Sequence, residues 1–307
     1  MAFFLSMPGA EALGTELAQL TGGVSEPVET RRFPDGETYV RVPPNLSGQD
    51  VFVTCRLSPP DLQFLALVFA ARAARSSGAK TLKLIAPYLP YLRQDRIFRD
   101  GEALSSTIFA DLVSREFDGL VTVDPHLHRY SSLAEIYTIP TMVLSAAKLI
   151  GQWVRDHVES PIVLGPDAES EQWAKAIADA AGAPWATFSK VREGDRQVRL
   201  RAPDLQPWRG RQPVLVDDII SSGTTMLEAA RYLIGEGFRA PHCAVVHGLF
   251  DPDTAERLKE FSSGLVTTDT IPNAYSDIAI APLIAAELPC DSLIRGLDDP
   301  APAKGNS

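Results

Sequence analysis

The 307-residue sequence has few cysteines, no long apolar run and a shortage of positive charge. Its three cysteines, Cys55, Cys243 and Cys290, are odd in number and form neither a C-x-x-C pair nor a metal-ligand spacing, which favours a reducing compartment. No apolar segment approaches the roughly 18 residues of a membrane helix, and the N-terminus lacks the basic region of a signal peptide. We therefore expect a cytoplasmic protein without a membrane span.

Basic residues are outnumbered by acidic ones, 29 against 39, which gives a formal net charge of -10. This balance disfavours binding to nucleic acid or to anionic membranes, although local basic pockets remain possible. The apolar share of 45% and the charged share of 22% are ordinary for a folded protein. At roughly 150 residues per domain, the length predicts two domains.

Short β-rich segments alternate with segments of helical composition, which is typical of an α/β fold with mostly parallel sheets flanked by helices. The expected strands span residues 51–55, 81–86, 120–124, 162–165, 214–217, 244–248 and 264–268. One helix is expected over residues 61–77, and another has Leu227, Ala230, Leu233 and Ile234 on one face. We expect two similar α/β domains, residues 1–145 and 146–290, and a C-terminal tail, residues 291–307.

The segment from Val214 to Thr225 is the most informative for chemistry. An apolar strand ends in Asp217 and Asp218, and a loop of small residues leads into a helix: Ser221, Ser222, Gly223, Thr224 and Thr225. Open α/β sheets bind ligands at the carboxyl ends of their strands, and hydroxyls and N–H groups at a helix N-terminus suit a phosphate. Adjacent carboxylates can hold ribose hydroxyls. The alternative is an ordinary turn in which Ser or Thr caps the helix.

Together with this loop, several other segments resemble the ribose-phosphate pyrophosphokinase family. The loop itself resembles the phosphoribosyl-diphosphate loop of the type I phosphoribosyltransferase fold. The other matching segments keep the order of the family and are residues 32–40, 87–96, 121–126, 165–167 and 190–192. The resemblance implies transfer of the diphosphoryl group of Mg-ATP to O1 of ribose 5-phosphate, giving 5-phosphoribosyl 1-diphosphate and AMP.

The resemblance also implies a role for individual residues. The implied ATP-binding residues are Phe33, Asp35, Glu37, Arg93, Gln94, Asp95 and His126. The implied ribose 5-phosphate ligands are Asp217, Asp218 and the loop from Ser221 to Thr225, and the implied Mg²⁺ ligands are Asp124, His126 and Asp167. Lys190 and Arg192 match the cationic pair that stabilises charge on the transferring phosphates. The family further implies a homo-oligomer with the ATP site near a subunit interface.

Several of these residues have a plainer interpretation. Residues 34–36, Pro-Asp-Gly, are typical of a hairpin turn, and the charged cluster after Leu92 could be a solvated turn with i,i+3 ion pairs. His126 and His128 could be packed or hydrogen-bonded side chains. Lys190 and Arg192, two residues apart on an expected hairpin, could be ordinary exposed charges. In the functional interpretation, three strand ends carry carboxylates that converge on one metal-phosphate site: Asp124, Asp167 and the pair Asp217-Asp218.

The sequence departs from the common family pattern in two loops. Ser221-Ser222 replaces an acidic residue and a Thr, and the loss of the acidic residue resembles the minority, archaeal-like class. Thr224 replaces a Gly and could tighten the backbone around the 5-phosphate. Glu169-Ser170 stands where the pyrophosphate loop usually has two glycines, which let backbone N–H groups approach a diphosphate. Two other functions remain open at this point: a phosphoribosyltransferase that consumes the diphosphate, and a non-enzymatic regulatory subunit associated with a synthase.

Overall fold

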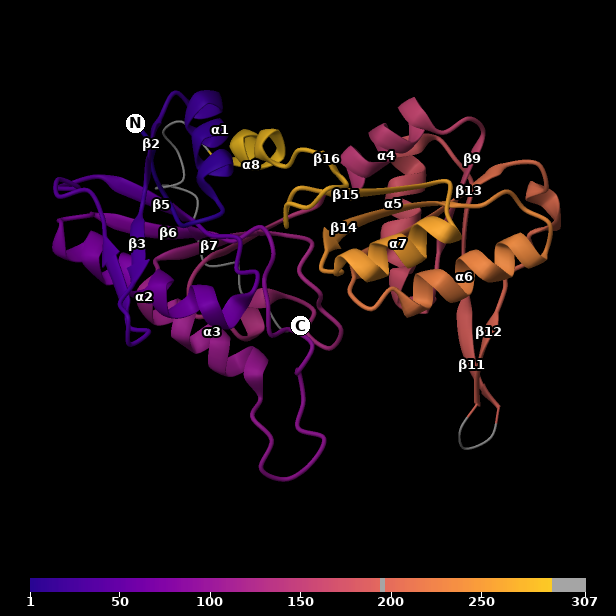
Figure 1. Cartoon of the computed structure of the whole chain (residues 1–307), viewed down its shortest axis with the longest axis horizontal. Coiled ribbons are helices and arrows are strands. Elements are labelled where there is room, and N and C mark those ends of the chain that lie inside the picture. Colours follow the sequence, from indigo (N-terminus) through magenta and orange to yellow (C-terminus); the bar gives the residue numbers. More distant parts are fainter. Residues whose placement is uncertain (194–196, 289–307) are drawn as a thin grey trace, which may run out of the picture. The chain divides into compact units, whose positions relative to one another are not determined.

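The computed structural model describes residues 1–193 and 197–288, and the chain divides into two compact units. The first unit contains Met1–Leu144, and the second is Ser145–Ile280. Helix α8 (Ala281–Glu287), which the sequence analysis placed in the second half, belongs to the first unit. It packs against α1 (Glu11–Thr21) and buries Ala281 and Ile284 (Figure 1). The expected tail, residues 291–307, lies outside the described residues.

The first unit is built on a six-stranded parallel sheet with the strand order β2-β1-β5-β6-β7-β8. Its strands are β1 (Phe3–Ser6), β2 (Val24–Pro27), β5 (Asp50–Thr54), β6 (Thr81–Ile85), β7 (Gly119–Val123) and β8 (Thr141–Leu144). Helices α2 (Pro60–Ser76) and α3 (Ser105–Glu116) cover one face of the sheet, and α1 and α8 cover the other (Figure 1). A separate antiparallel hairpin pairs β3 (Glu29–Arg32) with β4 (Thr38–Arg41).

The second unit repeats this plan with the strand order β10-β9-β13-β14-β15-β16, again all parallel. Its strands are β9 (Pro161–Gly165), β10 (Trp185–Thr187), β13 (Gln212–Ile220), β14 (His242–Gly248), β15 (Gly264–Thr268) and β16 (Ser276–Ile278). Its helices are α4 (Ala147–His157), α5 (Glu171–Ala181), α6 (Thr224–Gly235) and α7 (Pro252–Glu260). An antiparallel hairpin pairs β11 (Ser189–Glu193) with β12 (Gln197–Arg201).

The two sheets are topologically equivalent, which confirms the expected α/β fold of two similar halves. In each unit the chain forms the first two strands of the sheet, then an antiparallel hairpin, and then the remaining four strands in order. Strand β5 therefore corresponds to β13, and the hairpin β3–β4 corresponds to β11–β12. The structural equivalence places the loops after β5 and after β13 at the same point of their sheets, the carboxyl end of the third strand.

Each unit has its own apolar core, to which both strands and helices contribute. In α6, Leu227, Ala230 and Leu233 are buried, as their spacing predicts, but Ile234 is 39% exposed. Ile234 projects onto the same face as Leu227 and Ala230, but it is the last residue before Gly235, where α6 ends, so the helix end leaves it exposed. The strands that the sequence predicted begin and end within a few residues of the expected positions, except β13, which continues to Ile220; β1, β2, β8 and β16 were not among them.

Candidate functional site

The loop between β13 and α6 is shorter than the sequence analysis expected, because the strand does not end at Asp217. Asp217 and Asp218 both lie within β13, and β13 pairs with β14 as far as Ile220. Only Ser221, Ser222 and Gly223 separate the strand from the helix. The carboxylate pair is therefore fixed by a sheet, close to a tight loop and a helix N-terminus.

The N-cap of α6 is Gly223, so the alternative of a Ser or Thr N-cap is wrong. Gly223 has φ 70°, a left-handed conformation that glycine adopts without a steric penalty. A Cβ there would come within 3.0 Å of Thr254 Cγ2. Within the described chain no side chain caps this helix, and its first turn has no acidic residue. The first N–H groups and the positive end of the dipole are thus open to an anion.

Two hydroxyl groups of the loop, those of Ser222 and Thr224, lie next to each other at this helix end. Ser222 Oγ and Thr224 Oγ1 are 3.1 Å apart and share a hydrogen bond. Ser222 and Thr224 are exposed, whereas Gly223 is buried against α7. The loop therefore presents hydroxyls and backbone amides to solvent on a rigid base, which is the arrangement that binds phosphate groups.

Asp217 lies in an unfavourable electrostatic environment. Burial raises the pKa of its carboxyl well above the ordinary value, and the negative charges of Asp218 and Asp167 raise it further. Asp218 is only 3% exposed, and its N–H donates to Asp217 Oδ1 at 3.0 Å. The interaction brings Asp167, from the loop after β9, into the same acidic group as the pair on β13. A cation or the hydroxyls of a sugar would relieve this repulsion.

Asp167 also caps the short 3-10 helix Ala168–Ser170. Its Oδ1 accepts from the N–H of Glu169 at 3.1 Å, and its own N–H donates to Ser170 Oγ at 3.3 Å. Ser170 is buried and its Oγ donates to the carbonyl of Asp167 at 2.6 Å. The side chain of Asp167 also accepts from the N–H of Ser170, so both amides of the Glu169-Ser170 pair are already bonded here, and Glu169 is exposed.

The hairpin β11–β12 contains the two cations expected to act in catalysis. Its backbone pairs Lys190 with Leu200 and Arg192 with Val198, so the predicted extended hairpin is present. The side chains of Lys190 and Arg192 lie outside the described part of the chain. Their position on the same ribbon, two residues apart, agrees with the sequence analysis.

In the first unit, the segment with Phe33, Asp35 and Glu37 forms the turn of the hairpin β3–β4. The N–H of Phe33 donates to the carbonyl of Glu37 at 2.8 Å, and the N–H of Glu37 donates to Asp35 Oδ1 at 3.2 Å. Phe33 is 38% exposed and is covered on one side by the guanidinium of Arg31, 4.5 Å from the ring centre. The turn interpretation is correct, and it leaves an aromatic side chain on the surface that could bind a base.

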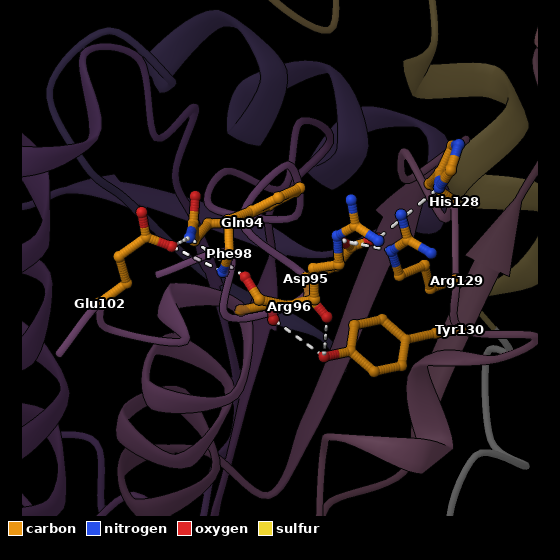
Figure 2. Close-up of polar contacts among 9 residues, drawn as sticks. Gln94, Asp95, Arg96, Phe98, Glu102, His128, Arg129 and Tyr130 are labelled. Atoms are coloured by element: carbon orange, nitrogen blue, oxygen red, sulfur yellow. Dashed lines mark hydrogen bonds and ion pairs between the residues drawn. The ribbon is translucent and has the colours of Figure 1, made fainter. Parts of the chain in front are cut away.

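Arg93 and Gln94 lie in the loop between β6 and α3, and their environments differ. Arg93 is exposed, and among the described residues its guanidinium has no hydrogen-bonding or ionic partner. Gln94 Nε2 donates to the carbonyl of Arg96 at 3.2 Å and contacts Glu102 Oε2 at 3.4 Å (Figure 2). Glu102 also accepts the N–H of Phe98 at 2.7 Å, so its side chain links residues at two points of the same loop.

The carboxylate of Asp95, the third expected ATP ligand of this loop, is bound within the protein. Its Oδ1 accepts from Arg129 Nε at 3.2 Å, and its side chain is 5% exposed. The plainer interpretation predicted i,i+3 ion pairs within this charged cluster. Asp95 instead pairs with Arg129, which belongs to the segment after β7. The sequence analysis did not single out Arg129, although the run His126-Leu-His-Arg-Tyr130 after β7 was a basic and aromatic signal next to a candidate ligand.

Asp124 directly follows β7 and has a strained backbone. Its φ is 35°, it is 8% exposed, and its N–H donates to the carbonyl of Leu144 at 2.8 Å. Leu57 after β5 and Tyr91 after β6 also have positive φ values, 37° and 64°. Non-glycine residues in this conformation gather at functional sites. In the first unit, they gather at the carboxyl edge of the sheet, where His126 also lies.

The structure places the expected metal ligands in both units. Asp124 and His126 belong to the first unit, whereas Asp167, Asp217 and Asp218 belong to the second. Within residues 1–193 and 197–288, no group of three or more His, Cys, Asp or Glu side chains is placed to hold a metal ion. Convergence of all these acids on one metal stays a prediction.

The raised pKa of Asp217 predicts a stability gain on neutralisation. The unfolded carboxyl ionises near the ordinary value of 3.8, whereas the folded one resists ionisation. The wild type therefore loses stability relative to Asp217→Asn as the pH rises above about 4. We expect the variant to melt about 2–4 °C higher at pH 7, with a smaller difference at pH 4, measured by calorimetry.

The control for this measurement is Glu228→Gln, which neutralises an exposed carboxylate on α6. Its Tm should stay near that of the wild type at both pH values. A lower Tm for Asp217→Asn at pH 7, or a difference that grows on acidification, would contradict the electrostatic description.

Comparisons with known proteins agree with this geometry. The family model described as the N-terminal domain of ribose phosphate pyrophosphokinase matches residues 2–116, and the phosphoribosyl transferase domain model matches residues 132–280. In the described residues, no helix has the length and apolar character needed to cross a membrane.

Relatives match over nearly the whole chain. A ribose-phosphate pyrophosphokinase of Methanopyrus kandleri is 37% identical over 278 residues, covering 89% of this chain and 94% of the relative. One of Methanothermobacter thermautotrophicus is 34% identical, covering 90% and 96%. The crystal structure of phosphoribosylpyrophosphate synthetase from Mycobacterium smegmatis has a TM-score of 0.80 and 26% identity, covering 93% of this chain and 97% of that one. The chain therefore belongs to the ribose-phosphate pyrophosphokinase family.

Proposed function

We propose that this chain transfers the diphosphoryl group of Mg-ATP to O1 of ribose 5-phosphate, with the sugar phosphate bound at the loop between β13 and α6. The observation that carries the proposal is the uncapped start of α6 at Gly223, next to the paired carboxylates of Asp217 and Asp218. The amides and hydroxyls of the loop from Ser221 to Thr225 would hold the 5-phosphate. The carboxylates would accept hydrogen bonds from the ribose hydroxyls and position O1.

The equivalent loop of the first unit supports this assignment by contrast. It follows β5, and it leads into α2 with Pro59 at the N-cap and Pro60 as the first helical residue. Proline has no N–H, and Asp61 adds a negative charge to the first turn. The two halves thus share a fold, but only the loop after β13 has the donors and the charge that suit a phosphate.

We assign the ATP contacts to the first unit. Arg93 is an exposed cation in an acidic protein, and Gln94 lies beside it with an amide suited to a purine. Phe33, Asp35 and Glu37 form an exposed turn that would contact the adenine end of ATP. His126 follows β7 and would lie near the triphosphate. The positive φ of Asp124 two residues earlier supports a functional role for this strand end.

Lys190 and Arg192 are the proposed catalytic residues. The support is their place on the hairpin β11–β12, which follows directly after the sheet strand β10. Their charges would balance the negative charge that develops on the transferring phosphates, which is the main task of an enzyme in phosphoryl transfer. This reaction does not require a strong general base, so positioning and electrostatics account for the chemistry.

Mg²⁺ is the metal that the acidic groups of the site fit. The carboxyl of Asp217 is destabilised by its neighbours Asp218 and Asp167, and Mg²⁺ is commonly held by one or two carboxylates together with substrate oxygens. We propose Asp167 in the second unit, and Asp124 and His126 in the first unit, as candidate Mg²⁺ ligands. When bound, Mg²⁺ would neutralise phosphate charge and polarise the transferring phosphorus.

The two other functions considered for the sequence have less support. A phosphoribosyltransferase would use the loop after β13, but it would not need the exposed turn at Phe33 or the basic loop at Arg93. A regulatory subunit would not need Lys190 and Arg192 on an intact hairpin. We place the protein in the cytoplasm, supported by Cys55 and Cys243, two free buried thiols whose pKa values are raised to about 12 by burial.

Release of AMP tests the reaction and the catalytic residues together. With ATP, Mg²⁺ and ribose 5-phosphate, we expect the wild type to release AMP and form a product containing both ribose phosphate and diphosphate, identified by mass spectrometry. Lys190→Ala should reduce kcat by roughly a hundredfold or more, because a transition-state charge contact is lost. Lys175→Ala, which removes an exposed lysine of α5, should not change kcat.

Three outcomes would contradict this proposal. Absence of AMP release by the wild type would favour a regulatory subunit, and diphosphate release that depends on a nucleobase and not on ATP would favour a transferase. Wild-type turnover by Lys190→Ala would refute the catalytic assignment.

We also propose that the chain forms a homo-oligomer through α2 and α3. Their outer face exposes five large apolar side chains: Leu62 at 62%, Leu65 at 53%, Phe69 at 42%, Ile108 at 50% and Leu112 at 42%. The two helices together carry three basic and three acidic residues: Arg72, Arg75, Arg115, Asp61, Asp111 and Glu116. Their net charge is zero in a protein of charge -10. Local neutrality allows a second copy of an acidic chain to approach.

Charge substitution on this face tests the oligomer. We expect Phe69→Glu to lower the molar mass measured by light scattering, because a charge would be buried at the contact. Ile234→Glu, on an exposed position of α6 in the second unit, is the control and should leave the mass unchanged. An unchanged mass for Phe69→Glu, or a wild type that is monomeric, would refute the proposed contact.

A further inference from the structure

We infer that Arg129 is a positioning residue for ATP: its ion pair with Asp95 fixes the loop that carries Arg93 and Gln94 against the segment that follows β7. The inference rests on the proposed function, since it assumes that this loop contacts ATP. It adds a residue that acts through Asp95 and is not itself a proposed ligand of either substrate.

The burial of Asp95 is the first observation. The residues on both sides include exposed cations, yet the Asp95 side chain is only 5% exposed. Arg129 Nε donates to its Oδ1 at 3.2 Å, and His128 Nδ1 lies 3.9 Å from its Oδ2 (Figure 2). A carboxylate with so little water around it depends on such partners for its charge to be tolerated. The contact joins segments that are 34 residues apart in sequence.

Tyr130 provides a second connection between the same two segments. Its hydroxyl lies 3.0 Å from Ser106 Oγ and donates to the carbonyl of Asp95 at 3.5 Å. Ser106, at the start of α3, donates its N–H to the carbonyl of Gln94 at 3.3 Å. The carbonyl of Gln94 is thus held from α3, and both the carbonyl and the side chain of Asp95 are held from the segment after β7.

The rest of the loop is braced from within. Glu102 accepts the N–H groups of Phe98 and Arg99 at 2.7 and 3.1 Å, and the guanidinium of Arg96 lies 4.1 Å from the centre of the Phe98 ring (Figure 2). These contacts do not involve Arg129. Loss of Arg129 should therefore shift the loop relative to the strand ends without unfolding the loop itself.

The position of Arg93 follows from that of Asp95. Arg93 is two residues before Asp95, is exposed, and among the described residues has no partner of its own to fix it. A loop held in the binding geometry avoids an entropic cost when the ligand binds, and a shift of about 1 Å can be costly. The loss of Arg129 should therefore weaken ATP binding and leave ribose 5-phosphate binding unchanged.

Steady-state kinetics of the full-length protein with Mg²⁺ tests this inference. We expect Arg129→Ala to raise KM for ATP about tenfold, with KM for ribose 5-phosphate unchanged and kcat within about twofold of the wild type. Arg129→Lys retains the charge and should recover part of the loss. Asp95→Asn should raise KM for ATP in the same direction.

The matched control is Arg75→Ala. Arg75 pairs with Asp118 at 2.7 Å and its side chain is 36% exposed, close to the 39% of Arg129. Asp118 directly precedes β7, so this ion pair lies at the amino end of the strand and away from the candidate ATP segments. The control should leave KM for ATP unchanged, which separates a positioning effect from a general loss of an ion pair.

Two results would overturn the inference. One is an unchanged KM for ATP in Arg129→Ala, and the other is an equal rise of both KM values accompanied by a lower Tm, as expected of a merely structural role. If Arg129→Ala does not fold, the test uses Arg129→Lys and Asp95→Asn. A wild-type KM for ATP in both of these variants would refute the inference. A wild type that releases no AMP would refute the proposed function instead.

Discussion

The repulsion among Asp217, Asp218 and Asp167 is the interaction on which the candidate site depends. Strand β13 stays in the sheet to Ile220, so the two adjacent aspartates cannot move apart, and Asp167, from the loop after the neighbouring strand β9, adds a third charge. Three carboxylates this close together do not stabilise the fold. Natural sequences retain destabilising local features of this kind mainly at functional sites. The group is therefore best explained by what binds to it.

Duplication of the α/β plan is consistent with the proposed division of ATP and ribose 5-phosphate between two similar units. Both sheets place a loop at the carboxyl end of the third strand and an antiparallel hairpin before it. In the second unit the loop has glycine and hydroxyl residues, and the hairpin has Lys190 and Arg192. In the first unit the loop has Pro59 and Pro60, and the hairpin carries Phe33 at its tip. Equivalent positions have therefore acquired different chemistry.

The sequence was sufficient to predict the fold class, the similar halves and the segments that carry the candidate residues. Parallel strands bury both faces, so they appear in the sequence as continuous apolar runs. Residues 34–36, Pro-Asp-Gly, strongly prefer a turn conformation, so the hairpin turn was also predictable. The end of β13 was not predictable in the same way, because its polar residues Asp217 and Asp218 are kept in the strand by pairing with β14.

Other features depended on contacts between distant segments. The placement of α8 in the first unit comes from packing on α1, which is more than 250 residues away in sequence. The pairing of Asp95 with Arg129 likewise has no local signature, since each residue alone is an ordinary charge. The resemblance to the family implied roles for Lys190 and Arg192, but it did not indicate the ion pair between Asp95 and Arg129.

A crystal structure of the protein soaked with ribose 5-phosphate and Mg²⁺ tests the central claim most directly. Our account predicts the 5-phosphate at the N-terminus of α6, in hydrogen-bonding contact with the amides after Gly223, and the ribose hydroxyls at Asp217 and Asp218. A sugar phosphate bound elsewhere, with this loop and its carboxylates facing only solvent, would contradict it.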